Sequence, residues 1–150
     1  MAHFAEINSS TGEVIRVLHV DDADTSTDGG LEQESIGIAH LEKYHGGTWK
    51  QCSYNTINGS HVKGGTAFRL NYPGKGWFYS TVKDVFYPPR PVDINGKTCN
   101  SWTIDIEKGE WNPPHTAPTT SGKGYTWNEA IWEGNDSEGW VEFTKNAGGS

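Results

Sequence analysis

The chain has 150 residues and a formal net charge of −7, with 33% hydrophobic residues, 19 glycines and seven tryptophans. This length fits one domain, or one domain with an added module, and the recurring aromatic residues exclude a disordered chain. The sequence contains no run of Lys and Arg, so we expect no nucleic acid as a partner. Its apolar runs are all much shorter than the roughly 20 residues that span a bilayer, so we expect no membrane as a partner.

The N-terminus and the cysteines indicate a reducing compartment of synthesis. The N-terminal sequence MAHFAEINSS has the composition of neither a signal peptide nor an anchor. Cys52 and Cys99 have a spacing that matches no zinc motif. A disulfide between them is one alternative, and two buried free thiols are the favoured one, because no secretion signal precedes them.

A β-hairpin is predicted at the start of the chain. Apolar and polar residues alternate within residues 3–7 and 14–20, on either side of the turn sequence NSSTG. The polar sequence DDADTSTDGG at residues 21–30 then ends the second strand. Its aspartates do not match an EF-hand loop, because Thr27 stands where that loop, counted from Asp22, requires glycine. We interpret this segment as an exposed acidic loop before a helix N-terminus.

Residues 31–44, from Leu31 to Tyr44, are the good helix candidate of the sequence. Apolar side chains recur there at steps of three and four residues, acidic residues stand near the N-terminus, and Lys43 and His45 stand near the C-terminus. Gly46 and the glycine after it predict the end of the helix. A glycine inside a helix costs about 1 kcal/mol relative to alanine, so we interpret Gly37 as a mark of close packing against a strand.

Two further strands are expected before residue 73. The sequence TWKQCSYNTI at residues 48–57 is typical of a short strand and contains Trp49 and Tyr54. In the glycine-rich stretch at residues 58–76, Phe68, Leu70 and Tyr72 alternate on one face, which predicts another strand.

Three aromatic segments then follow a common plan of strand, short polar turn and aromatic return strand. They are WFYSTVKDVFYPPRP at residues 77–91, SWTIDIEKGEWNPPHTAP at 101–118 and YTWNEAIWEG at 125–134, with turns expected at 82–84, 107–109 and 129–130. The first two contain a double proline, which cannot join a sheet interior and predicts an extended strap after each hairpin. A lone hairpin is marginal in water, so each needs to pack on another hairpin or on a neighbouring chain.

The aromatic residues of these hairpins have two interpretations. The favoured one is that they form the cores of small units, as large aromatics do in small domains. The other is that some are exposed and contact a sugar or a partner, since Trp and Tyr are enriched at the energetic centres of interfaces. The candidate partner-binding residues are Trp77, Tyr79, Phe86, Trp102, Trp111, Trp127 and Trp132.

The sequence carries no pattern typical of an enzyme. Its six histidines fall in no HExxH or GxSxG motif and pair with no cysteine at a useful spacing. His40 and His45 lie five residues apart, so they do not share a helix face well. A pair of catalytic carboxylates of the kind that glycosidases use stays an open alternative, because what matters is the distance between the two carboxylates in space and not their spacing in the sequence. We expect no catalytic residue, no cofactor and no metal site.

Nine short motifs occur in a fixed order along the chain. They are MAHFA (1–5), VIRVLHV (14–20), DGG (28–30), ESIGIA (34–39), GGTWKQCSYN (46–55), FYPPRP (86–91), SWTID (101–105), WNPP (111–114) and YTWNE (125–129). In this order the sequence resembles small virion proteins of tailed bacteriophages, especially marine and cyanobacterial ones. The resemblance covers about residues 1–133. The chain is longer than expected at residues 55–72 and departs after Trp132, where residues 140–143 are expected to add a strand.

The resemblance implies a non-enzymatic structural protein of the phage particle, made in the cytoplasm of the host bacterium and incorporated into the virion. Its favoured place is the outer surface of the capsid, as a decoration or cement protein. The alternative is a tail, neck or fibre component, with binding to a host glycan through exposed aromatics. Expected partners are other virion proteins of the capsid or tail and further copies of the chain in a homo-oligomer.

Together these elements predict an α+β fold that is mostly β. Residues 1–73 are expected to form an α+β domain with an N-terminal antiparallel sheet and one short helix. Residues 74–150 are expected to form a region of Trp/Tyr-rich β-hairpins joined by Pro-Pro straps.

Overall fold

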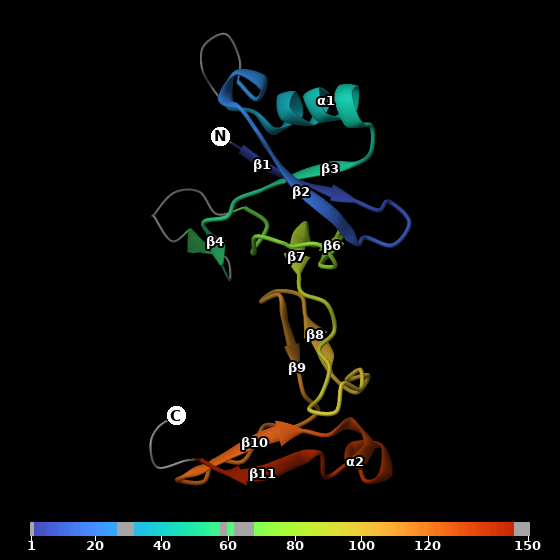
Figure 1. Ribbon diagram of the computed structural model, residues 1–150, viewed down its shortest axis with the longest axis vertical. Helices are drawn as coiled ribbons and strands as arrows, with labels where there is room; N and C mark the ends of the chain where they lie inside the picture. Colours follow the sequence, from blue (N-terminus) through green and yellow to red (C-terminus); the bar gives the residue numbers. More distant parts are fainter. Residues whose placement is uncertain (1, 27–31, 58–59, 62–67, 146–150) are drawn as a thin grey trace. The chain divides into compact units, whose positions relative to one another are not determined.

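The computed structural model describes residues 2–26, 32–57, 60–61 and 68–145 (Figure 1). Contacts divide the chain into unit 1, Met1–Pro89 with Ile106–Glu110, and unit 2, Arg90–Asp105 with Trp111–Ser150. The expected division after residue 73 stays a prediction, but these contacts group the first aromatic hairpin with the N-terminal sheet.

Unit 1 is built on a three-stranded antiparallel sheet in the order β2-β1-β3. The strands are β1 (Ala2–Ile7), β2 (Val14–Val20) and β3 (Trp49–Cys52). β1 and β2 form the predicted hairpin around the turn at residues 8–12. Successive side chains of a strand point to opposite faces, so the central strand buries Phe4 in one core cluster and Ala5 in another.

Helix α1 (Glu34–His45) supplies one of these two clusters. Leu41 packs there with Phe4 and Trp49. Gly37 lies directly on the ring of Phe4, because a Cβ at this position would be 2.3 Å from Phe4 Cζ. This contact confirms the close packing that the glycine predicted.

The helix begins later than expected, although the predicted start, Leu31, lies outside the described residues. Glu32 forms an isolated β-bridge and accepts a hydrogen bond from Gln51 of β3, which holds this segment extended. The predicted basic residues do lie in the last turn, and the helix ends at Gly46 with a φ of 67°. A positive φ of this kind is readily adopted by glycine.

The first aromatic hairpin, β6 (Phe78–Ser80) with β7 (Val85–Tyr87), is confirmed. Its Tyr79 and Phe86 join the second core cluster of unit 1, together with Ala5 of β1. The backbone N–H of Tyr79 donates to Gly12 O at 2.8 Å, which fastens the hairpin to the β1–β2 turn.

The prediction of a strand with Phe68, Leu70 and Tyr72 is wrong, because residues 68–72 do not form one. Residues 62–67 of the same glycine-rich stretch lie outside the described residues. Arg69 and Leu70 adopt positive φ values of 47° and 72°, which no strand can accommodate. The Arg69 guanidinium compensates for this backbone: its Nε donates to Asp84 Oδ1 at 2.7 Å and its Nη1 lies 2.8 Å from Glu34 Oε1. Ionic hydrogen bonds of this kind are the strong ones.

Three short elements complete unit 1: the 3-10 helix η1 (Asp22–Asp24) and the paired strands β4 (Thr56–Ile57) and β5 (Ser60–His61). The prediction of two buried free thiols is confirmed for Cys52 in unit 1 and for Cys99 in unit 2. Burial raises the pKa of the Cys52 thiol to about 12.

From Arg90 onward the chain forms two-stranded ribbons and a second helix. The elements are β8 (Thr103–Asp105), β9 (Glu110–Asn112), β10 (Lys123–Trp127), α2 (Glu129–Gly134) and β11 (Trp140–Thr144). β8 pairs with β9 and β10 pairs with β11, which confirms the second aromatic hairpin and the added C-terminal strand.

The third predicted hairpin is wrong. Residues 129–134 form α2 instead of a turn and a return strand, and β10 pairs with the later strand β11. The reason is local: Asn128 is an N-cap residue whose Oδ1 accepts from the Ile131 N–H at 3.1 Å. Side-chain caps of this kind stabilise helix starts by about 1 kcal/mol.

The fold is therefore mostly β with few helices, as predicted, with an N-terminal antiparallel sheet and β-hairpins. In the described residues, neither α1 nor α2 has the length and apolar character needed to cross a membrane.

Candidate functional site

Three tryptophans of unit 2, Trp102, Trp127 and Trp140, gather with His115 in one aromatic cluster. The ring centroid of Trp127 lies 5.9 Å from that of Trp102, 5.1 Å from that of Trp140 and 5.6 Å from that of His115. All three pairs are edge-to-face, an arrangement that the quadrupoles of aromatic rings favour. Trp127 is buried at the centre, so this cluster is the core of unit 2.

A buried carboxylate fixes the orientation of the cluster. Glu129, the first residue of α2, is 1% exposed. Its Oε1 accepts from Trp127 Nε1 at 2.8 Å and from Ser101 Oγ at 2.6 Å, and its Oε2 accepts from the Ser101 N–H at 2.9 Å. Burial opposes ionisation of Glu129, but the hydrogen bonds from Ser101 and Trp127 outweigh it and lower the pKa of this carboxyl.

Asp93 supports Glu129 from the other side. Its Oδ2 accepts from the Glu129 N–H at 2.8 Å, and its Oδ1 accepts from the N–H groups of Asn95 at 2.8 Å and Lys97 at 2.9 Å. Burial opposes ionisation here too, and the backbone donors, Glu129 first, outweigh it and lower the pKa of Asp93. Donors of the chain itself occupy both carboxylates, which favours a structural role for this pair over acid–base chemistry.

The three candidate partner-binding residues of unit 1 lie in or on its core. Tyr79 and Phe86 are buried, with their ring centroids 5.4 Å apart. Trp77 is half-buried and packs against the same core cluster. Because Tyr79 and Phe86 are buried, Trp77 offers the most surface to a partner among these three residues.

The structure brings together two of the four candidates in unit 2, Trp102 and Trp127. Trp111 instead lies under the guanidinium of Arg90, whose Cζ is 4.4 Å from the ring centroid. Trp132 is half-buried on α2, and within the described chain its Nε1 and that of Trp102 are buried with no hydrogen-bond partner. Partner binding through these residues stays a prediction.

A set of exposed apolar residues in unit 2 was missed by sequence reasoning. The register of β10 with β11 pairs Gly124 with Phe143 and Thr126 with Val141, on the face opposite to the tryptophans. We call these four residues the outer face. Phe143 is 48% exposed and Val141 37% exposed. Phe143 lies over Gly124, where a Cβ would be 2.2 Å from Phe143 Cζ.

More apolar surface borders β10. Val92 and Ile94 are both exposed and line a shallow depression of about 350 Å³ together with Thr126 and Trp127. The Ile94 N–H donates to Trp127 O at 3.4 Å, which holds this segment along the edge of β10. Trp102 and Trp140 also line the depression, so it belongs to the tryptophan side of the ribbon, and Thr126 is the residue that it shares with the outer face.

The described residues contain no group of three or more His, Cys, Asp or Glu side chains placed to hold a metal ion. Comparison of the chain with models of known protein families, with curated proteins and with solved structures finds no match.

Proposed function

We propose that the protein is a non-enzymatic structural component of a bacteriophage particle and acts through assembly contacts. Its proposed place is the outer surface of the capsid, as a decoration or cement protein, with the tail, neck or fibre as the alternative. The ordered motifs that resemble small phage virion proteins support this proposal. The observation that carries it is the outer face, which leaves Val141 and Phe143 accessible to water.

An exposed apolar face on a two-stranded ribbon favours association. A two-stranded ribbon is marginal in water and becomes stable when another layer covers its hydrophobic face. In unit 2 the tryptophans take one face of the β10–β11 ribbon, and the outer face is the other. Apolar burial contributes about 25 cal/mol per Å², so a partner that covers Phe143 stabilises both the contact and the ribbon.

The partner that suits the outer face is an apolar patch of another coat protein or of a second copy of this chain. Aromatic anchors near the centre of an interface carry most of its binding energy. Phe143 meets this description, because it is the largest exposed side chain of the outer face. Its cross-strand neighbour is Gly124, which has no side chain that could cover the ring.

Incorporation of variants into particles tests the proposal. Phe143→Ser should reduce the number of copies per particle about tenfold or more, because an interface aromatic contributes about 2 kcal/mol. Val82→Ser is the matched control, since Val82 is 87% exposed in the turn between β6 and β7. Equal incorporation of the two variants, each first shown to be folded by circular dichroism, would exclude the outer face as the docking element.

The oligomeric state of the purified protein gives a second test. We expect a concentration-dependent homo-oligomer or a poorly stable monomer, and Phe143→Ser should shift the population toward monomer. Light scattering that shows a compact, heat-resistant monomer at all concentrations would contradict the proposal.

A further inference from the structure

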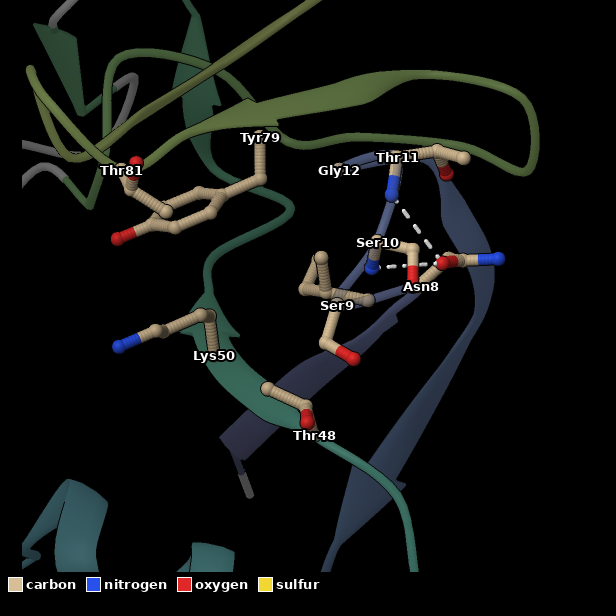
Figure 2. Close-up of a pocket in the computed structure, with 10 residues that line it drawn as sticks. Asn8, Ser9, Ser10, Thr11, Gly12, Thr48, Lys50, Tyr79 and Thr81 are labelled. Atoms are coloured by element: carbon tan, nitrogen blue, oxygen red, sulfur yellow. Dashed lines mark hydrogen bonds between the residues drawn. The ribbon is translucent and has the colours of Figure 1, made fainter.

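Unit 1 contains a depression, lined in part by hydroxyl-bearing side chains, that the proposed assembly function does not use (Figure 2). Its volume is about 330 Å³. Three segments that are distant in sequence line it: the β1–β2 turn at residues 8–12, the start of β3 with Thr48 and Lys50, and the β6–β7 hairpin with Tyr79 and Thr81.

Hydrogen bonds hold the rim of this depression in place before any ligand arrives. Asn8 Oδ1 accepts from the N–H groups of Ser10 at 2.9 Å and Thr11 at 3.2 Å, as Figure 2 shows. The Gly12 N–H donates to Asn8 O at 2.7 Å, and Gly12 O in turn accepts from the Tyr79 N–H at 2.8 Å. A site fixed in this way loses little conformational entropy on binding.

Four hydroxyl groups of the lining have no partner of their own. Within the described part of the chain, the side chains of Ser9, Ser10, Thr48 and Thr81 make no hydrogen bond. Each hydroxyl can donate one hydrogen bond and accept two. Such a set matches a ligand whose own groups both donate and accept, which is the property of a polyol.

Lys50 adds one positive charge to this neutral surface. Its Nζ lies 5.6 Å from the ring centroid of Tyr79, and no carboxylate lines the depression among the described residues. The neighbouring acidic group, Asp84, already accepts hydrogen bonds from Arg69 at 2.7 Å and from the hydroxyl of Tyr79. Asp84 also interacts electrostatically with Lys50 and so offsets part of its charge. Among the described residues Lys50 forms no ion pair, so the hydrogen-bond donors of its ammonium stay available to an anion, although the whole chain carries a net charge of −7.

We propose that this depression binds an acidic monosaccharide unit, a sugar ring that bears a carboxylate. Lys50 pairs with the carboxylate, and the hydroxyls of Ser9, Thr48 and Thr81 bond the hydroxyls of the sugar. A small-ligand pocket typically measures about 300–1,000 Å³, and a volume at the low end of this range suits a single ring. Phosphate recognition typically uses planar guanidinium groups or converging backbone N–H groups, whereas this site offers one ammonium among hydroxyls.

Nuclear magnetic resonance of the isotope-labelled full chain provides the test, with D-glucuronate as the probe and D-glucose and inorganic phosphate as comparisons. Glucuronate should shift the resonances of Ser9, Lys50 and Thr81 and bind about tenfold more tightly than glucose, because a charge-assisted hydrogen bond is worth about one factor of ten or more. Lys50→Gln should abolish that preference. Lys75→Gln, which changes an exposed lysine outside the depression, should leave it unchanged.

A second variant keeps the test independent of the charge. Thr81→Val should weaken the binding of glucuronate and glucose alike, by about threefold to tenfold, while the thermal unfolding midpoint stays within a few degrees. The proposal is overturned if glucuronate binds no more tightly than glucose, if Lys50→Gln keeps the preference, or if phosphate binds the same residues as tightly as glucuronate. Phe143→Ser should bind glucuronate normally, so failure of the assembly proposal leaves this one standing.

Discussion

Replacing Glu129 by glutamine removes the charge at the centre of unit 2 with almost no change of shape. The carboxylate accepts three hydrogen bonds, from Trp127 Nε1 and from the hydroxyl and the N–H of Ser101. A glutamine amide has one oxygen, so if it takes the place of Oε1, its NH₂ group faces the Ser101 N–H, donor against donor. A buried donor left without an acceptor costs about 1–3 kcal/mol, and the remaining bonds also lose their ionic character. We therefore expect Glu129→Gln to destabilise the protein by about 2–4 kcal/mol.

Denaturant unfolding followed by tryptophan fluorescence measures this cost, and hydrogen exchange of the Trp127 indole N–H reports the loss of its acceptor directly. Glu133→Gln is the matched control on the same helix. Glu133 pairs with Lys97 at 2.7 Å, but both side chains are nearly half exposed, so its loss should cost less than about 0.5–1 kcal/mol. If the two variants unfold at the same denaturant concentration, the assignment of Glu129 as the organising carboxylate is incorrect.

Three further predictions follow from buried groups. Gly37→Ala should destabilise the protein by about 1–3 kcal/mol, because its Cβ would lie 2.3 Å from Phe4 Cζ. The control, Gly134→Ala, adds a Cβ that meets nothing within 4 Å and should be neutral or stabilising by up to about 1 kcal/mol. Calorimetric melting compares the two variants, and a Gly37→Ala protein more stable than the wild type would refute the contact. The pKa values of Asp93 and Glu129 are lowered in the folded state, so their contribution to stability is present above their unfolded values near 4 and is lost as pH falls through the folded ones. Near-ultraviolet circular dichroism should show loss of the tryptophan cluster only below about pH 4, and loss at pH 6 would contradict this. Cys52, with its pKa raised to about 12, should react with a thiol reagent only after unfolding, so rapid labelling of the native protein would show that it is accessible.

Elements set by local sequence were predictable. The β1–β2 and β6–β7 hairpins follow from alternating residues on either side of polar turns. Gly37 signalled its contact with Phe4, because a glycine in the middle of a helix costs about 1 kcal/mol relative to alanine and a close neighbour offsets that cost. Periodicity could not identify α2, since six residues make fewer than two turns, although the capping residue Asn128 was a usable signal.

Features set by distant residues were not predictable. The bend at Arg69 exists because Glu34 and Asp84, from two other segments, bind its guanidinium. The composition identified the tryptophans as candidate binding residues, but tertiary packing decides whether a ring faces the core or the solvent. Trp127 is 4% exposed, whereas Phe143, which was not among the candidates, is 48% exposed. Alternation in residues 140–144, read against β10, would have placed Phe143 opposite the tryptophans.

The depression beside Lys50 shows the same limit. It combines a turn at residues 8–12, a strand around Lys50 and a hairpin around Tyr79, and no motif in any one of them indicates a site. Only the fold brings the hydroxyls and the ammonium together, which is why sequence reasoning searched for a glycan site among the tryptophans instead.

We propose that this chain is a stoichiometric part of a phage particle. Quantitative mass spectrometry of purified particles of the phage whose genome contains this sequence, as proposed, is the measurement that tests it. We expect peptides of this chain at a fixed ratio to the major capsid protein, retained through density-gradient purification. Particles that contain none of the chain, although infected cells produce it, would contradict the account.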